Sequence, residues 1–172
     1  DKAKVYLAEI KVLRAHYNMQ LVSLWGDIPY FETSVTAEQL KNMTRTPWRE
    51  VVDKIMIDLE EAASILPWEA SEWGRVDKSV ALGLKARMGL YAGSWCKFGF
   101  GRDAVKDEAQ AEIYFKESAA AAKRVINESG RDLAINYKDL FTRTGQMKSD
   151  VKKESMLLIA FITEIREHHK QH

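Results

Sequence analysis

Four segments of the chain carry apolar residues at steps of three or four, and this repeated spacing constrains the fold more than any other feature. The segments span about residues 1–25, 46–66, 77–95 and 107–129. Gly26, Pro67 and Gly130 stand where three of them end, and both residue types terminate helices. The pattern therefore predicts an all-α fold of four long amphipathic helices that pack as antiparallel pairs.

The stripes also predict which side of each of the first two helices is buried. In the first segment the stripe consists of Ile10, Leu13, Tyr17, Leu21 and Leu24. In the second it consists of Val52, Ile55, Leu59, Ala62 and Leu66. Thr46 is expected to cap the second helix, with Pro47 at its first position, where the missing N–H costs nothing.

The third segment has two kinds of face. Its large residues are Leu84, Met88, Tyr91 and Trp95, and its small ones are Gly83, Ala86, Gly89 and Gly93. Because interior glycines weaken a helix by about 0.5–1 kcal/mol each relative to alanine, their alignment predicts close approach of another helix.

The pairing of these helices has two possible forms. Ala111-x3-Phe115 in the fourth segment matches half of a tetratricopeptide repeat, and Leu82-Gly83-x2-Ala86 is a degraded version of the other half. On spacing alone, an ordinary helix bundle fits equally well. Beyond the four segments, residues 137–141 predict a short turn or helix, and the apolar run within 154–162 predicts a strand or a buried extended segment.

Composition excludes several functions. The 26 basic and 25 acidic side chains nearly cancel, so neither a broad nucleic-acid surface nor a polybasic membrane anchor is expected. The longest apolar run, 156–162, is too short to cross a bilayer. The single cysteine, Cys96, allows no internal disulfide.

Several blocks of residues, in a fixed order, resemble the SusD/RagB family. The first reads Leu13-Arg14-Ala15-His16-Tyr17, then Leu21-Val22, then Trp25-Gly26-Asp27-Ile28-Pro29. Later blocks are Thr46-Pro47, Asp58-Leu59-Glu60, Gly74-Arg75-Val76, Ala86-Arg87-x3-Tyr91, Leu140-Phe141 and Glu154-Ser155. The resemblance extends over nearly the whole chain.

The resemblance implies a tetratricopeptide-like α-α superhelix and a function. Members of the family bind oligosaccharide or other nutrients without catalysis at the outer-membrane surface and deliver them to a TonB-dependent SusC-like transporter. They are longer than this chain and carry a lipid-anchored cysteine, which Cys96 cannot be. We therefore expect residues 1–172 to form one helical domain and to be a fragment without the anchor. The alternative function is a tetratricopeptide-type scaffold for protein–protein interaction.

A glycan site needs aromatic faces and hydrogen-bonding groups on loops. The predicted glycan-binding residues are Trp68, Trp73, Phe98, Phe100 and Arg75. The competing interpretation is that the aromatic residues seal the ends of the core. The remaining tryptophans, Trp25, Trp48 and Trp95, lie on or beside helices and are predicted to be core residues.

Other polar residues are interpreted structurally. Arg14 and Asp27 are expected to form charge pairs that fix helix geometry. Asp58, Glu60 and Glu61 are placed on exposed helix faces by their spacing, which argues against the facing carboxyls of a glycoside hydrolase. His168, His169 and His172 could bind a metal but are interpreted as a polar tail. We therefore expect no catalytic residues, no metal and no cofactor.

Overall fold

The structure is a computed structural model that describes residues 2–72, 74–99 and 105–157. Its four long helices are α1 (Lys2–Trp25), α3 (Trp48–Ile65), α4 (Lys78–Phe98) and α5 (Glu108–Glu128). The shorter ones are α2 (Ala37–Lys41), α6 (Ser149–Glu154) and two 3-10 helices, Tyr137–Phe141 and Gly145–Met147. Within these residues the only β-type pairing is an isolated bridge between Ile28 and Thr46. The predicted all-α fold is confirmed.

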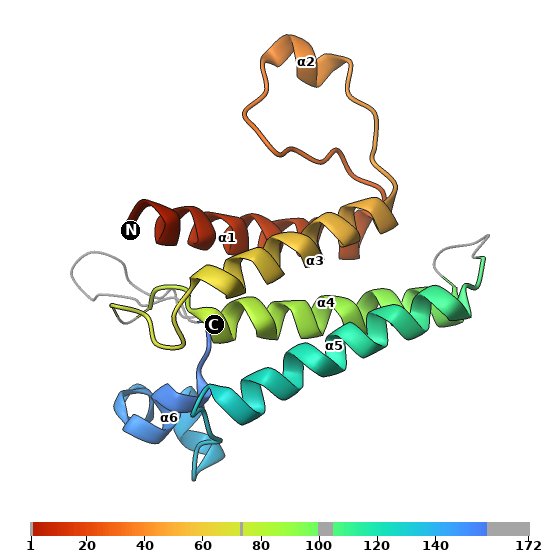
Figure 1. The fold of residues 1–172 in the computed structure, drawn as a ribbon. Coiled ribbons are helices and arrows are strands. Elements are labelled where there is room, and N and C mark those ends of the chain that lie inside the picture. The colour runs from red at the N-terminus through yellow and green to blue at the C-terminus, as the bar shows by residue number, and fades with distance from the viewer. Residues whose placement is uncertain (1, 73, 100–104, 158–172) are drawn as a thin grey trace, which may run out of the picture.

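The long helices form a layered succession in which each runs antiparallel to the one before it (Figure 1). α1 packs on α3, α3 packs on α4, and α4 makes its most extensive contact with α5. Direct contact between α1 and α4 is slight. The succession of antiparallel pairs is the predicted tetratricopeptide-like arrangement.

The ends of two helices follow the predicted chemistry, and the start of a third does not. Gly26 and Gly130 both adopt a φ of 68°, a left-handed conformation that glycine accepts without strain. Thr46 does not cap α3: Pro47 holds the N-cap position, not the first helical position predicted for it, and the Thr46 backbone pairs with Ile28. Instead Asp27 accepts a 2.8 Å hydrogen bond from the backbone N–H of Trp48, so the turn after α1 caps α3.

The core is centred on α3, whose predicted stripe is confirmed. Ile55, Leu59 and Ala62 are fully buried, between α1 on one side and α4 on the other. The amphipathic spacing of this segment therefore corresponds directly to its packing, because a helix in this position needs one wide apolar face.

The predicted stripe of α1 is wrong. Ile10 and Tyr17 are 60% and 62% exposed, and Leu13, Leu21 and Leu24 are exposed with them. The buried stripe is the opposite side of the helix, made of Ala8, Val12, Ala15, Met19 and Val22. Each stripe has helical spacing, and the smaller one is buried because α1 lies close against α3.

The small face of the third predicted helix is confirmed where α4 meets α5. A Cβ atom on Gly89 would lie 2.9 Å from the carbonyl oxygen of Tyr114, and one on Gly93 would lie 2.6 Å from the ring of Phe115. Only glycine permits this approach. Gly83 lies apart from that contact and faces the side chain of Met156.

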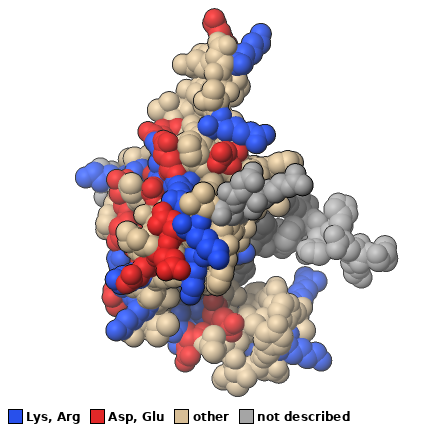
Figure 2. All heavy atoms as spheres, turned by 90° about the vertical axis from the view of Figure 1, so that its right-hand side faces the viewer, with Lys and Arg blue, Asp and Glu red and all other residues tan. Residues whose placement is uncertain are grey.

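Residues 31–46 form an arm that leaves the bundle between α1 and α3 and carries α2 near its tip (Figure 1). A capping box between Thr36 and Gln39 starts α2. Figure 2 shows the arm standing above the body, with acidic and basic side chains interspersed on the face below it.

The segment after α5 folds back onto the start of α4. Arg131 pairs with Asp77 at 2.5 Å and donates a 3.0 Å hydrogen bond to the carbonyl of Ser155. The short helix predicted at residues 137–141 is confirmed as a 3-10 helix. The strand expected within 154–162 does not occur at residues 154–157, where α6 ends, and the rest of that run lies outside the described residues.

Candidate functional site

The structure describes three of the five predicted glycan-binding residues, and these three lie at opposite ends of α4. Trp68 and Arg75 lie in the connection between α3 and α4, whereas Phe98 is the last residue of α4. These two ends are separated by a 21-residue helix, which is about 30 Å long. Trp73 and Phe100 lie outside the described residues. The glycan-binding role of these five residues stays a prediction.

Two of these side chains already have intramolecular partners. Trp68 is half-buried against the core, and the Lys78 ammonium lies 5.1 Å from its ring centroid. Arg75 donates two hydrogen bonds to Glu9 and stacks 4.9 Å from the ring centroid of Tyr6. The hydrogen bond to Glu9 raises the pKa of Arg75. Arg75 thus ties the α3–α4 connection to α1.

Phe98 differs because its side chain is 70% exposed. It belongs to the end of the bundle where α1 and α4 finish and α3 starts (Figure 1). The Lys97 ammonium lies 5.6 Å from the Phe98 ring centroid. Of the predicted aromatic residues that the structure describes, Phe98 offers the more accessible ring.

The same end of the bundle holds further aromatic side chains. Trp95 contacts Trp48 edge-on, with 5.1 Å between ring centroids, and Tyr91 at 4.3 Å. Trp48 and Trp95 pack against the core, as predicted. Trp25 does not: it is 67% exposed, so its assignment to the core is wrong. It is the last residue of α1.

Arg14, Asp58 and Tyr30 form a charged node between α1 and α3. Arg14 donates to one carboxylate oxygen of Asp58 through Nε at 2.9 Å and through a terminal nitrogen at 2.6 Å. Tyr30 donates its hydroxyl to the same oxygen at 3.2 Å. Burial, followed by the charge of Asp58, raises the pKa of Tyr30 to about 12.

This node corrects two expectations. Arg14 pairs with Asp58 and not with Asp27, which caps α3 instead. Asp58 is buried, although its spacing was interpreted as exposed. A signal was present in the sequence, since Asp58 lies three residues after Ile55 and four before Ala62 and so shares their stripe.

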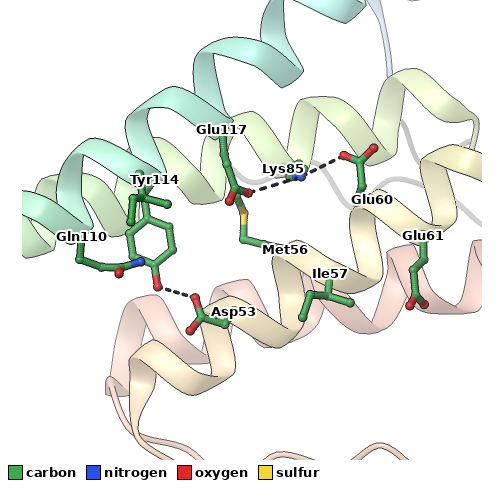
Figure 3. Close-up of a pocket in the computed structure, with 10 residues that line it drawn as sticks. Asp53, Met56, Ile57, Glu60, Glu61, Lys85, Gln110, Tyr114 and Glu117 are labelled. Atoms are coloured by element: carbon green, nitrogen blue, oxygen red, sulfur yellow. Dashed lines mark hydrogen bonds and ion pairs between the residues drawn. The ribbon is translucent and has the colours of Figure 1, made fainter.

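A groove of about 460 Å³ runs between α3 and α5, with α4 beneath it (Figure 3). Lys85 rises from α4 and bridges the two walls, at 2.9 Å from Glu60 of α3 and 3.4 Å from Glu117 of α5. Tyr114 of α5 donates a 2.6 Å hydrogen bond to Asp53 of α3. Burial is the main cause of the raised pKa of Tyr114.

The charged groups of this groove form ion pairs within the protein. Glu60 also pairs with Arg124 at 2.8 Å, and these cationic partners lower the pKa of Glu60 against the opposing effect of burial. Glu61 pairs with Lys11 of α1. The groove therefore works as a polar staple that holds α3, α4 and α5 together.

Residues 2–72, 74–99 and 105–157 offer neither a metal site nor a membrane-spanning helix. No group of three or more His, Cys, Asp or Glu side chains there is arranged to hold a metal ion. In the same ranges no helix has the length and apolar character needed to cross a bilayer. The histidines at 168, 169 and 172 lie outside these ranges.

Comparison with known sequences identifies relatives. The model of a SusD-like family, described as starch-binding and associating with the outer membrane, matches residues 2–90. A SusD-like protein of Bacteroides ovatus is 28% identical over 158 residues, covering 91% of this chain and 26% of the relative. SusD-like protein P25 of Formosa agariphila is 25% identical over 149 residues, covering 84% and 24%. The chain thus spans about a quarter of the length of these relatives.

Solved structures share the fold. A SusD homologue from Bacteroides thetaiotaomicron superposes with a TM-score of 0.71 at 22% identity, over 97% of this chain and 30% of that one. A structure with xylogluco-oligosaccharide gives the same TM-score of 0.71 at 25% identity, over 92% and 30%. Because the family model matches more than half of the residues and these folds agree, the chain belongs to the SusD-like family.

Proposed function

We propose that the protein containing this chain binds oligosaccharide at the outer-membrane surface, breaks no bond, and passes the sugar to a TonB-dependent SusC-like transporter. The observation that carries this proposal is the likeness to the structure with xylogluco-oligosaccharide, which extends over 92% of the chain at 25% identity. The family description, starch-binding and outer-membrane associated, supports both the ligand class and the location. A lipid anchor outside this chain would hold the protein there.

Within that protein the four long helices would act as the platform that positions sugar-binding side chains. The buried core of α3 and the polar staple between α3, α4 and α5 give the platform its rigidity. Among the predicted contacts, Phe98 is favoured because its ring is exposed. Trp68 and Arg75 are less suited, since bound sugar would have to displace Lys78 or break the pairing with Glu9.

Calorimetric titration of the full-length protein tests the proposal. Xylogluco-oligosaccharides and malto-oligosaccharides are the first probes, followed by a wider panel of plant and host glycans. We expect saturable binding to at least one class and no release of reducing sugar from it. No measurable binding to any glycan of the panel contradicts the proposal, and so does hydrolytic activity that remains after purification to homogeneity.

A tetratricopeptide-type scaffold is the second candidate function, and the outer face of α1 favours it. Tyr6, Ile10, Leu13, Tyr17, Leu21 and Leu24 expose a continuous apolar stripe. Apolar stripes of this kind mark surfaces that other proteins cover. A pull-down with the full-length protein separates the candidates, because retention of a TonB-dependent transporter supports the first and retention of an unrelated protein supports the second.

A further inference from the structure

A second hollow, of about 390 Å³, lies at the base of the arm, where residues 30–35 pass over the first turns of α3. We call it the arm notch. Its lining includes the rings of Tyr30 and Phe31, the hydroxyl of Thr33, and the charged groups of Glu32, Glu50 and Lys54.

Contacts on both segments of the arm, the one that leaves α1 and the one that enters α3, hold the arm notch in shape. Ile28 and Thr46 exchange backbone hydrogen bonds of 3.2 and 2.9 Å, which close the base of the arm. Arg14 donates to the carbonyl of Glu32 at 3.0 Å, and Lys54 pairs with the Glu32 carboxylate at 2.5 Å. A site fixed in advance loses less entropy on binding than one that must be ordered by its ligand.

The state of the polar groups distinguishes the arm notch from the groove between α3 and α5. In the groove, each carboxylate is paired with a cation or hydrogen-bonded to Tyr114. In the arm notch, the exposed Glu50 carboxylate interacts electrostatically with Lys54, one helical turn away, but neither this carboxylate nor the exposed Thr33 hydroxyl makes a hydrogen bond to another described residue. Both groups can therefore form hydrogen bonds to a ligand without breaking an internal hydrogen bond.

The combination of groups matches the chemistry of sugars. A carboxylate accepts hydrogen bonds from sugar hydroxyls, an ammonium donates to them, and an aromatic ring packs against the C–H face of the sugar ring. The arm places these groups beside the first turns of α3.

From this geometry we propose that the arm notch is a saccharide-binding subsite, with Phe31 as the packing surface and Glu50 and Thr33 as hydrogen-bonding groups. The proposal rests on the proposed function, since it places part of the oligosaccharide contact within this chain. It differs from the sequence-based prediction, because none of the five residues predicted there lines the arm notch. A bound sugar there would contact both the arm and α3.

The test uses the full-length protein and xylogluco-oligosaccharide or malto-oligosaccharide, whichever the wild type binds. Phe31→Ala and Glu50→Gln should each raise the Kd about tenfold, because the loss of one charged hydrogen bond or one packing surface corresponds to about one decade in affinity. Leu40→Ala and Glu38→Gln are the matched controls. They make similar changes in α2, away from the arm notch, and should leave the Kd within about twofold.

Hydrogen exchange gives a second, independent measurement. Added sugar should slow amide exchange at residues 30–35 and 46–54 in the wild type, and circular dichroism should show that all variants remain folded. Unchanged Kd values for Phe31→Ala and Glu50→Gln, or protection confined to other regions, overturn the subsite while the proposed function stands. A wild type that binds no glycan overturns the proposed function, and the subsite is rejected with it.

Discussion

α4 and α1 are helices of similar length that are buried in opposite ways. α4 is covered by α3 and α5, and its buried residues include both large side chains and the glycines that face α5. α1 is covered on one side only, by α3. The residues that α1 buries there have small or medium side chains, while its larger apolar residues face outward. Apolar spacing therefore shows that a face can be covered, but not which face is covered in this domain.

The difference has a physical origin in the distance between helix axes. Glycine and alanine allow two helices to approach closely, so the closest contacts are made by the smallest side chains. This is the case for Gly89 and Gly93 against α5, and for Ala8 and Ala15 within the buried side of α1. The large apolar side chains of α1 lie on its other side, where they are exposed.

The contact between α4 and α5 should be the most sensitive to added volume. Gly89→Val places methyl groups against the carbonyl of Tyr114, 2.9 Å from the new Cβ, and should lower the free energy of unfolding by about 3 kcal/mol. Denaturant unfolding measures the change. The control is Ala119→Val on the exposed side of α5, and an equal loss in both variants contradicts the close-contact argument.

The Arg14–Asp58 pair should be the next most sensitive feature. Asp58→Asn keeps the shape of the side chain but leaves the Arg14 guanidinium without its counter-charge, at a cost of about 2 kcal/mol in unfolding free energy. Glu112→Gln, which removes an exposed pairing with Lys116, is the control and should cost less than about 0.5 kcal/mol. If both variants lower the unfolding free energy equally, the Arg14–Asp58 pair stabilises the fold no more than an exposed ion pair does.

The two sides of α1 can be compared by direct truncation. Val12→Ala removes two methyl groups from a buried position and should lower the unfolding free energy by about 1.5 kcal/mol. Ile10→Ala, on the exposed side, should change it by less than about 0.5 kcal/mol in the isolated domain. A larger effect for Ile10→Ala would mean that the outer face is covered in solution.

The alkaline titration of Tyr30 tests the same Arg14–Asp58 node through its pH dependence. Its pKa is about 12 in the folded state, above the usual tyrosine value of 10.0, so the folded protein holds this proton more tightly than the unfolded chain does. The resulting stabilisation is complete below pH 10 and is lost as the pH rises toward 12. Tyr30→Phe should therefore lose less stability than the wild type over this range, as measured by denaturant unfolding, and identical losses contradict the coupling.

The fold was largely predictable from the sequence, because its signals are local. Spacing at three and four residues located all four long helices, and Gly26 and Gly130 indicated two helix ends. In the structure both glycines adopt the left-handed backbone conformation expected there. The small face of α4 predicted a close neighbour, which proved to be α5. The ordered blocks of family residues indicated the SusD-like family directly.

The candidate sites were harder to predict, because they depend on contacts between distant segments. Asp58 meets Arg14 across 44 positions of sequence, and Asp27 caps α3 across 21. The arm notch combines residues 30–35 with α3, and neither segment carries a recognisable motif for it. Trp68 and Phe98 looked equivalent as loop aromatics, yet one packs on the core and the other is exposed.

The sequence by itself determined that this chain is helical, where its helices lie and which family it belongs to, since those properties follow from neighbouring residues and their order. Only the tertiary structure decided which stripe of α1 is buried, which carboxylates are paired, and which hollow contains polar groups that make no hydrogen bond to another described residue. Those outcomes depend on how closely helices approach one another in space, and residue spacing along one helix carries no information about that distance.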